Sequence, residues 1–391
     1  MHIGFIKRNR AETWGGDLAV IGFYMNGLKK LGHEVSFAPS AFELQNTDFI
    51  IVPNSTIDLR TYHEQLRIVG KPYGILGFHE DVLNFLPPAR GFQNYIYSCM
   101  GYGFETDNGM AYSIEKLIER PYIVDYYGEP PRREVLYNYD LMAGARVCIA
   151  NSVTEESSMR RDCPSCKTTV IPVSPGILTG YDGTPDESFL EFTGLASKSY
   201  VIQVGRLELR KNQLATILAM RNIDIPLVFI ATSAFSQQYE VATIDAALQW
   251  RKAPTIFISQ SLKALDKGSV KVISIDNKLP KEMLISAYAH AGLHIHPAFQ
   301  ELPGATYLEA ARLGTPTIGS SWCTITDYFY DPSAGHSNLD GRIVYTQPHH
   351  IKEIEKLVPE MFGKNFPELD HPSFRYTEAE AAQALVAAIC K

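Results

Sequence analysis

The chain has 391 residues, of which 45% are hydrophobic and 20% are charged. These values are typical of a globular protein and exclude a disordered chain, a collagen-like repeat and a coiled coil. The 36 Lys and Arg against 43 Asp and Glu give a net charge of −7. This charge argues against nucleic-acid binding over a broad basic surface but is compatible with a local basic pocket. Because a lone domain seldom exceeds about 300 residues, the length predicts two domains.

The apolar segments predict a cytoplasmic protein. The N-terminus begins with one short apolar strand, residues 3–6, and not with a basic region and a long apolar run, so we expect no signal peptide. No apolar stretch reaches the about 18 residues of a membrane-spanning helix. A peripheral contact with a membrane surface stays open.

Six cysteines are few for this length. Cys163 and Cys166 have the spacing of a redox motif or of half a zinc site. No second such pair and no suitably spaced histidine pair completes a zinc site. The favoured interpretation is a polar loop after a helix.

Strand and helix patterns alternate along the first half of the chain. Nearly continuous apolar strands suit a parallel sheet covered on both faces, and short links predict a doubly wound α/β domain. A helix after Gly15 and Gly16 ends at Gly32. Strands are expected over residues 3–6, 33–37, 48–53, 73–78, 146–151 and 169–173.

Residues 84–130 interrupt this alternation and contain seven tyrosines. Two interpretations are equally supported. The rings could stack on sugars or form a partner interface. Otherwise, the segment is a folded insertion with ordinary core aromatics.

A second α/β series follows a linker at residues 174–198, which is rich in Ser, Gly, Pro and Asp. The chain closes with a helix in which Thr377 and Glu380 fit a capping box. The strands of this series are expected over residues 199–205, 226–231, 255–258, 270–275 and 293–296.

The most informative segment starts at His296. A buried strand ends there, a loop carries Glu301, and a helix begins near Pro303 with Glu309 inside it. The helix N-terminus suits phosphate, and the two carboxylates could accept hydrogen bonds from sugar hydroxyls. The alternative is an exposed helix with ordinary acids.

A second segment places Arg206 just past the carboxyl end of a strand and Lys211 at the start of the next helix. Ligands of open α/β sheets bind at this edge, where two cations can converge on a diphosphate. By itself, such a pair is also compatible with ordinary surface cations.

Together these segments resemble the GT-B glycosyltransferases of the retaining family 4. Members carry G-R-x4-K, then E-x7-E followed by A-x3-G-x-P. This chain has, in the same order, Gly205-Arg206-x4-Lys211, Glu301-x7-Glu309-Ala310 and Gly314-Thr315-Pro316. The resemblance covers residues 1 to about 345 except 84–130. Its landmarks in the first half are Gly15-Gly16, Gly32-His33-Glu34-Val35, Phe78-His79-Glu80-Asp81, Asn151-Ser152 and Pro172-Val173-Ser174-Pro175-Gly176.

The resemblance implies an α/β GT-B fold, in which two doubly wound Rossmann-like domains face an interdomain cleft. Residues 1–185 would form the acceptor-binding domain and residues 186–376 the nucleotide-sugar-binding domain. The helix at residues 377–391 would pack back onto the first domain.

The resemblance also implies roles for the charged residues. Arg206 and Lys211 would bind the diphosphate of a nucleotide-sugar and stabilise the leaving charge. Glu301 would bind donor-sugar hydroxyls and Glu309 the ribose, so this is no glycosidase pair of nucleophile and acid. The remaining donor-binding positions are Gly15, Gly16, Gly205, Gly304, Ala305 and Thr306.

On the acceptor side, the resemblance places His79 near the donor sugar and makes Asn151 and Ser152 acceptor contacts. Structural alternatives exist for each, since a strand-end histidine is often structural and Asn151-Ser152 can cap the following helix. For His294 and His296, on a buried strand, core packing is favoured over a metal site.

The chain departs from the family pattern at several positions. Leu302 and Pro303 replace a Gly and an aromatic residue, and Pro303 has no N–H for a sugar contact. Residues 320–323 replace a Gly-rich turn. No Asp-x-Asp occurs in the chain, so we expect no metal at the diphosphate. The resemblance implies a UDP-, GDP- or ADP-sugar as co-substrate and no cofactor.

The predicted function is retaining transfer of a sugar from a nucleotide-diphosphate sugar to a glycan, lipid, small molecule or other acceptor. One alternative is a nucleotide-sugar epimerase or phosphorylase of related fold. A catalytically inactive binding protein is another. A DNA glucosyltransferase is disfavoured by the net charge of −7.

Overall fold

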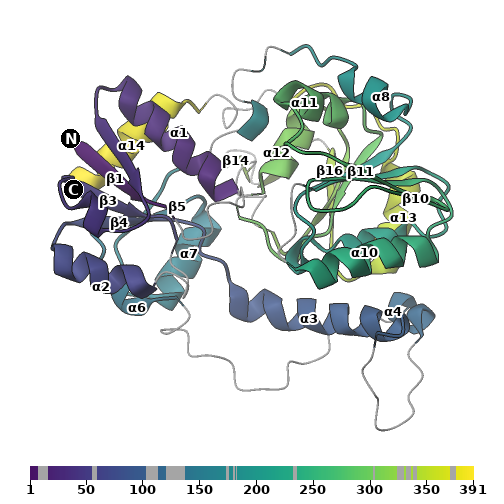
Figure 1. Cartoon of the computed structure of the whole chain (residues 1–391), viewed down its shortest axis with the longest axis horizontal. Helices are drawn as coiled ribbons and strands as arrows, with labels where there is room; N and C mark the ends of the chain where they lie inside the picture. The colour runs from purple at the N-terminus through teal and green to yellow at the C-terminus, as the bar shows by residue number, and fades with distance from the viewer. Residues whose placement is uncertain are drawn as a thin grey trace, which may run out of the picture.

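The computed structural model describes residues 1–7, 16–54, 60–102, 113–119, 137–172, 176–178, 181, 183–231, 236–302, 304–323, 330–331, 336–337, 341–369 and 376–391. Two α/β units lie side by side, each built around its own sheet (Figure 1).

The first sheet has the strand order β2-β1-β3-β4-β5-β6, and every neighbouring pair is parallel. Its strands are β1 (His2–Ile6), β2 (Glu34–Ala38), β3 (Phe49–Val52), β4 (Tyr73–Leu76), β5 (Val147–Ala150) and β6 (Thr168–Val170). Along β3, Phe49 and Ile51 join one hydrophobic cluster and Ile50 and Val52 join another, because successive side chains point to opposite faces. Both faces of this sheet are therefore covered, as its apolar strands predict.

Helices and short helical turns connect these strands. The helices of the first half are α1 (Gly16–Lys30), α2 (Arg60–Val69), α3 (Val82–Cys99), α4 (Ile114–Glu119), α6 (Tyr139–Gly144) and α7 (Val153–Asp162), with a 3-10 turn η1 (Phe42–Leu44). In the linker, η3 (Gly176–Leu178) is a second 3-10 turn.

The second sheet has the order β10-β11-β9-β8-β7-β12-β13-β16, and β10 on its edge is the antiparallel strand. The strands are β7 (Val201–Val204), β8 (Leu227–Ala231), β9 (Thr255–Ser259), β10 (Leu265–Lys267), β11 (Val270–Ser274), β12 (Leu293–His296), β13 (Thr317–Ser320) and β16 (Ile343–Thr346), beside a hairpin of β14 (Tyr330–Asp331) and β15 (His336–Ser337). The helices are α8 (Ser188–Thr193), η4 (Leu209–Lys211), α9 (Gln213–Ala219), α10 (Gln237–Trp250), α11 (Lys281–Ala289), α12 (Ala305–Arg312), α13 (Ile351–Met361) and α14 (Glu378–Cys390).

Each sheet contains a point at which the direction of the strand order reverses. In the second sheet β7 lies between β8 and β12, so the chain turns in opposite directions after β7 and after β12. Loops that diverge in this way leave space for a ligand at the carboxyl ends of the two strands. Gly205 follows one of these ends, and the loop to Glu301 follows the other.

The last helix, α14, packs on α1 of the first unit (Figure 1). Thr377 and Glu380 form the capping box expected from the sequence. Close approach depends on Gly27, because a Cβ there would lie 1.9 Å from the carbonyl oxygen of Glu378. Lys30 adds an ion pair of 2.5 Å with Glu378.

Helices α3 and α4 follow β4 in sequence but pack against the second unit (Figure 1). The ring of Phe92 lies 5.9 Å from that of Phe299. Tyr95 and Tyr97 are buried in the same core, and the Tyr102 hydroxyl donates to Asp245 of α10. These three tyrosines serve as packing and bridging residues. The other four of the segment, at positions 112, 122, 126 and 127, lie outside the described residues.

Across the described part of the chain, no helix combines the length and apolar character that crossing a bilayer requires.

Candidate active site

The loop after β7 has an unusual backbone. Gly205 has φ of 147°, a value that favours glycine. After η4, Asn212 takes a left-handed conformation at φ 58°. Its side-chain amide donates to the carbonyl oxygens of Pro297 at 3.0 Å and Pro348 at 2.7 Å. Asn212 thus fixes the loop after β7 to the loop after β12, a role that the motif did not indicate.

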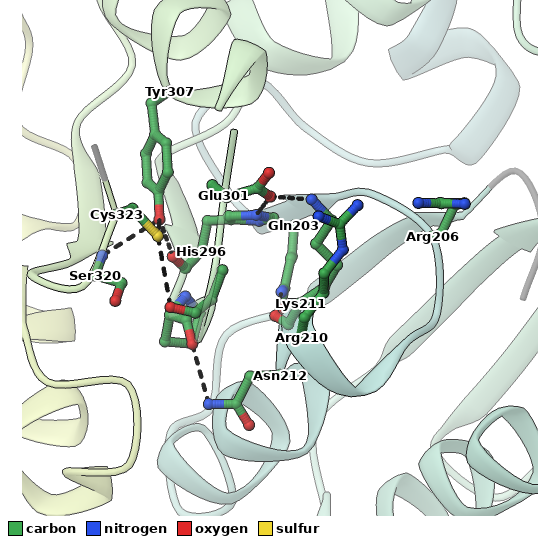
Figure 2. Close-up of polar contacts among 12 residues, drawn as sticks. Gln203, Arg206, Arg210, Lys211, Asn212, His296, Glu301, Tyr307, Ser320 and Cys323 are labelled. Atoms are coloured by element: carbon green, nitrogen blue, oxygen red, sulfur yellow. Dashed lines mark hydrogen bonds and ion pairs between the residues drawn. The ribbon is translucent and has the colours of Figure 1, made fainter. Parts of the chain in front are cut away.

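Lys211 and Glu301 meet at the centre of the site (Figure 2). The Lys211 ammonium donates to Glu301 Oε1, although 90 residues separate them. Both residues are buried, with 9% and 5% of their surface exposed. Burial opposes ionisation of Glu301, but the charge of Lys211, the hydrogen bond from His296 and the charge of Arg210 lower the pKa of Glu301 well below its ordinary value. Glu301 is therefore a carboxylate at neutral pH.

His296, the last residue of β12, supports this carboxylate. Its Nε2 lies 2.5 Å from Glu301 Oε1. Burial lowers the pKa of His296, so the ring is uncharged at neutral pH. Because an ionised carboxylate only accepts hydrogen bonds, Nε2 carries the ring proton. The sequence suggested core packing for His296. It is buried in the core and also contacts Glu301.

Tyr307 of α12 adds further contacts to the backbone of His296. Its hydroxyl donates to the backbone oxygen of His296 and accepts from the Ser320 amide at 3.3 Å. The Cys323 sulfur lies 3.9 Å from the same hydroxyl. The departures from the family pattern at residues 320–323 are thus part of the packing around the site (Figure 2).

Arg206 of the motif and the neighbouring Arg210 lie on the other side of Lys211 from Glu301 (Figure 2). Arg210 Nε contacts Glu208 at 2.7 Å and Arg210 Nη1 contacts Glu80 of the first unit at 2.5 Å. Arg206 Nη2 contacts Glu208 at 3.4 Å. Figure 2 shows Arg206 apart from the Lys211–Glu301 pair. The fold thus brings Lys211 and Glu301 into contact and leaves Arg206 at the margin.

The start of α12 carries three of the predicted donor-binding positions. Gly304 has a left-handed φ of 78°, and a Cβ there would lie 2.9 Å from the Tyr307 ring. Ala305 and Thr306 form the first turn, which has free N–H groups. Among the described residues, no group pairs with the buried hydroxyl of Thr306. This first turn follows the Glu301 loop directly and offers donors to an anion or a hydroxyl.

Glu309 lies further along α12 and is 6% exposed. A Cβ on Gly176 of η3 would lie 2.7 Å from Glu309 Oε1, so the carboxylate faces the linker. Burial raises the pKa of Glu309 to about 7, and Tyr288 and the Ile177 backbone offset part of the rise. The alternative of exposed, ordinary acids is wrong for both glutamates.

In the first unit, Gly15 lies outside the described residues and Gly16 is the first residue of α1. His79 has a fully buried side chain, and its Nε2 lies 2.9 Å from Asp162 Oδ2. Its ring also packs against Tyr137, with centroids 4.5 Å apart. These contacts are structural and hold the ring inside the first unit.

Asn151 and Ser152 also make structural contacts. The Asn151 backbone and side chain donate to Glu155 Oε2 at 2.5 and 2.9 Å, and Glu155 Oε1 accepts from the amides of Phe78 and His79. The Ser152 hydroxyl accepts from the Glu155 amide at 3.1 Å and caps α7. Glu155, which the sequence patterns did not single out, ties the loop after β4 to the loop after β5.

In the described residues, no group of three or more His, Cys, Asp or Glu side chains is arranged to hold a metal ion. The six cysteines are free thiols. Cys163 caps the end of α7, and both Cys163 and Cys166 are buried.

No protein-family model matches the chain, and no curated protein sequence does either. Solved structures do match it. Sucrose-phosphate synthase from Thermosynechococcus elongatus aligns with a TM-score of 0.59 and 13% identity, over 99% of this chain and 94% of that chain. Anabaena HepE, in complex with UDP and glucose, aligns with a TM-score of 0.60 and 12% identity, over 100% and 99%. A UDP-forming trehalose-phosphate synthase from Burkholderia xenovorans aligns with a TM-score of 0.55 and 10% identity, over 90% and 75%.

These likenesses, together with the two doubly wound sheets, show that the chain has the two-domain GT-B fold.

Proposed function

We propose that this protein is a retaining glycosyltransferase that transfers a sugar from a nucleotide-diphosphate sugar to an acceptor. One observation carries the proposal. The contact between Lys211 and Glu301 joins the two motif segments at the carboxyl ends of β7 and β12, where the strand order reverses. The matched structures support it, since they include a complex with UDP and glucose and a UDP-forming synthase.

In the proposed mechanism, Lys211 binds the diphosphate and stabilises the charge that develops as the glycosidic bond breaks. Arg206 adds a second cation after closure of the domains brings the phosphates toward it. The first turn of α12, with Gly304, Ala305 and Thr306, donates backbone hydrogen bonds. We propose that these groups stabilise the negative charge of the diphosphate in place of a metal ion.

Glu301 acts as a binding group and not as a proton donor. Its low pKa keeps it ionised, so it accepts hydrogen bonds from donor-sugar hydroxyls and has no proton for a leaving group. The leaving phosphate then takes the acceptor proton on the same face, which gives retention. Glu309 accepts from the ribose hydroxyls. Acceptor-side roles for His79, Asn151 and Ser152 stay predictions. Each of these side chains already contacts a residue of the first domain.

The test uses Lys211→Ala and Glu301→Ala, with Lys252→Ala as the matched control. Lys252 is an exposed lysine of the same domain. A panel of UDP-, GDP- and ADP-sugars is screened by thermal shift, because a true donor raises the melting temperature. Release of nucleoside diphosphate from the best donor is then measured, and the product anomer is read by NMR. We expect both site variants to lose at least about a hundredfold in turnover and the control to match wild type.

Wild-type turnover in both site variants would overturn the site assignment. An inverted product would overturn retention, and an altered free donor without transfer would indicate an epimerase.

A further inference from the structure

A pocket lies in the first domain, away from the candidate active site. It has a volume of about 240 Å³ and is lined by Arg146 and Val147 before and in β5, Lys167 to Thr169 around β6, and Ala388 and Lys391 at the end of α14. In Figure 1 the C-terminus lies beside this sheet. The pocket therefore joins the edge strand β6 to the last turn of the chain's final helix.

The lining of this pocket is positively charged. Arg146, Lys167 and Lys391 contribute three cationic side chains, all of them exposed, and no acidic side chain lines it. Within the described residues, none of the three forms an ion pair. A nearby acid, Glu156, is already held by Arg160 at 3.0 Å and by the Thr168 hydroxyl at 2.6 Å. Among the described residues, these three exposed side chains are therefore available to an anionic ligand.

The pocket lies at the opposite edge of the sheet from the loops that face the active site. Arg146 and Lys167 precede β5 and β6, whereas Asn151 follows β5. Because the strands are parallel, the amino ends and the carboxyl ends form separate edges. A ligand in this pocket would leave the Lys211–Glu301 pair free.

Interaction with the dipole of α14 explains only one of the three cations that line the pocket. Lys391 follows the carboxyl end of α14 and can offset its negative pole. Arg146 and Lys167 belong to strand ends and have no such role. The hydroxyl of Thr169 supplies a neutral donor at the same rim.

We propose that this pocket binds a small molecule or headgroup that carries a phosphate group. Arginine and lysine together suit a phosphate, which can accept several charge-assisted hydrogen bonds. The volume holds a phosphate with a small polyol but not a nucleotide-sugar, since pockets for drug-sized ligands span about 300–1,000 Å³. The phosphate can come from a soluble ester or from an anionic lipid.

The experiment uses full-length protein carrying Lys211→Ala, so that the main phosphate-binding cation of the proposed active site is removed. Binding of inorganic phosphate and glycerol phosphate is measured by calorimetry, and binding to phosphatidylcholine vesicles with and without phosphatidic acid by sedimentation. The pocket variant adds Arg146→Gln and Lys167→Gln. The control variant adds Lys252→Gln and Lys271→Gln, which remove two exposed lysines of the second domain.

We expect the pocket variant to bind the phosphate ligand at least about tenfold more weakly than the Lys211→Ala parent, and the control to match the parent. Binding in calorimetry identifies a soluble ester as the ligand class, and binding only to phosphatidic acid vesicles identifies a headgroup. Equal binding by the pocket and control variants, or no binding by the parent in either assay, would overturn the proposal. Circular dichroism of each variant checks that it is folded.

Discussion

Glu80 in the loop after β4 and Arg210 in η4 form an ion pair of 2.5 Å between the two domains. Arg210 also holds Glu208 at 2.7 Å, and its carbonyl oxygen accepts from the Phe299 amide at 2.7 Å. The loop that carries Lys211 is thus held by both domains and by the segment leading to Glu301. The position of Lys211 therefore depends on how the two domains are oriented relative to each other.

The Glu80–Arg210 pair should contribute a measurable coupling energy. Both side chains are partly exposed, at 27% and 19%, so we expect about 1 kcal/mol in a double-mutant cycle of Glu80→Gln and Arg210→Gln. The coupling should weaken as salt is added. Urea unfolding of the four proteins measures it, and strictly additive effects would show that the pair stabilises nothing.

Removing one partner of the Lys211–Glu301 pair should lower the free energy of unfolding more than replacing both partners together. Lys211→Met or Glu301→Gln alone leaves a buried group without its partner, and we expect a loss of about 3 kcal/mol in unfolding free energy. The double variant should be more stable than either single variant, although all three lack donor turnover. Denaturant unfolding with activity assays separates the two effects. A double variant less stable than both singles would contradict this account.

Glu309 should give the protein a pH dependence near neutrality. The folded protein holds this proton more tightly than the unfolded chain, since burial raises the pKa from 4.5 to about 7. The resulting stabilisation, about 3 kcal/mol, is fully present below pH 4.5 and is lost as the pH rises through 7. Glu309→Gln should remove this component of the stability profile.

Donor binding should show the opposite trend, because ribose hydroxyls donate to the ionised form. We expect the donor KM to rise as the pH falls below about 7, and this dependence to be absent in Glu309→Gln. An unchanged KM profile in the variant would remove Glu309 from the donor site.

Gly304 should be intolerant of a side chain for two reasons. Its φ of 78° disfavours any L-residue, and a Cβ would lie 2.9 Å from the Tyr307 ring. Gly341 is a matched control, with φ of 73° and open space around it. We expect Gly341→Ala to cost about 1 kcal/mol and Gly304→Ala to cost more and to raise the donor KM. Equal losses of unfolding free energy in the two variants would mean that the Tyr307 ring moves to accommodate the added Cβ.

The Ser152→Ala variant distinguishes two possible roles of Ser152, which are capping of α7 and contact with the acceptor. Loss of the cap should lower the unfolding free energy by about 1 kcal/mol. Ser236, which caps α10 by accepting from the Tyr239 amide, provides the comparison. If Ser152 only caps α7, both alanine variants keep the wild-type acceptor KM. A rise in acceptor KM confined to Ser152→Ala would assign it to the acceptor site.

Local signals in the sequence were sufficient for much of the fold. Apolar runs and glycine positions predicted the two series of parallel strands, because burial on both sheet faces leaves a continuous apolar pattern. The family resemblance singled out Lys211, Glu301 and Glu309, and the structure buries all three, while their roles in donor binding stay predictions. The capping box of Thr377 and Glu380 was also predicted from the sequence and is confirmed, since it lies within four consecutive residues.

The contacts between distant segments were decided by the tertiary structure. The sequence did not indicate the ion pair between Arg210 and Glu80, because the two residues lie in loops of different domains and the tertiary fold decides which loops meet. Likewise, α3 follows β4 of the first sheet in sequence but packs on the second domain, since its apolar face with Phe92 contacts the ring of Phe299. The sequence thus determined the strand pattern and the candidate residues, and packing between strands and domains decided which of these residues lie in contact, because contacts between distant segments depend on the order of the strands.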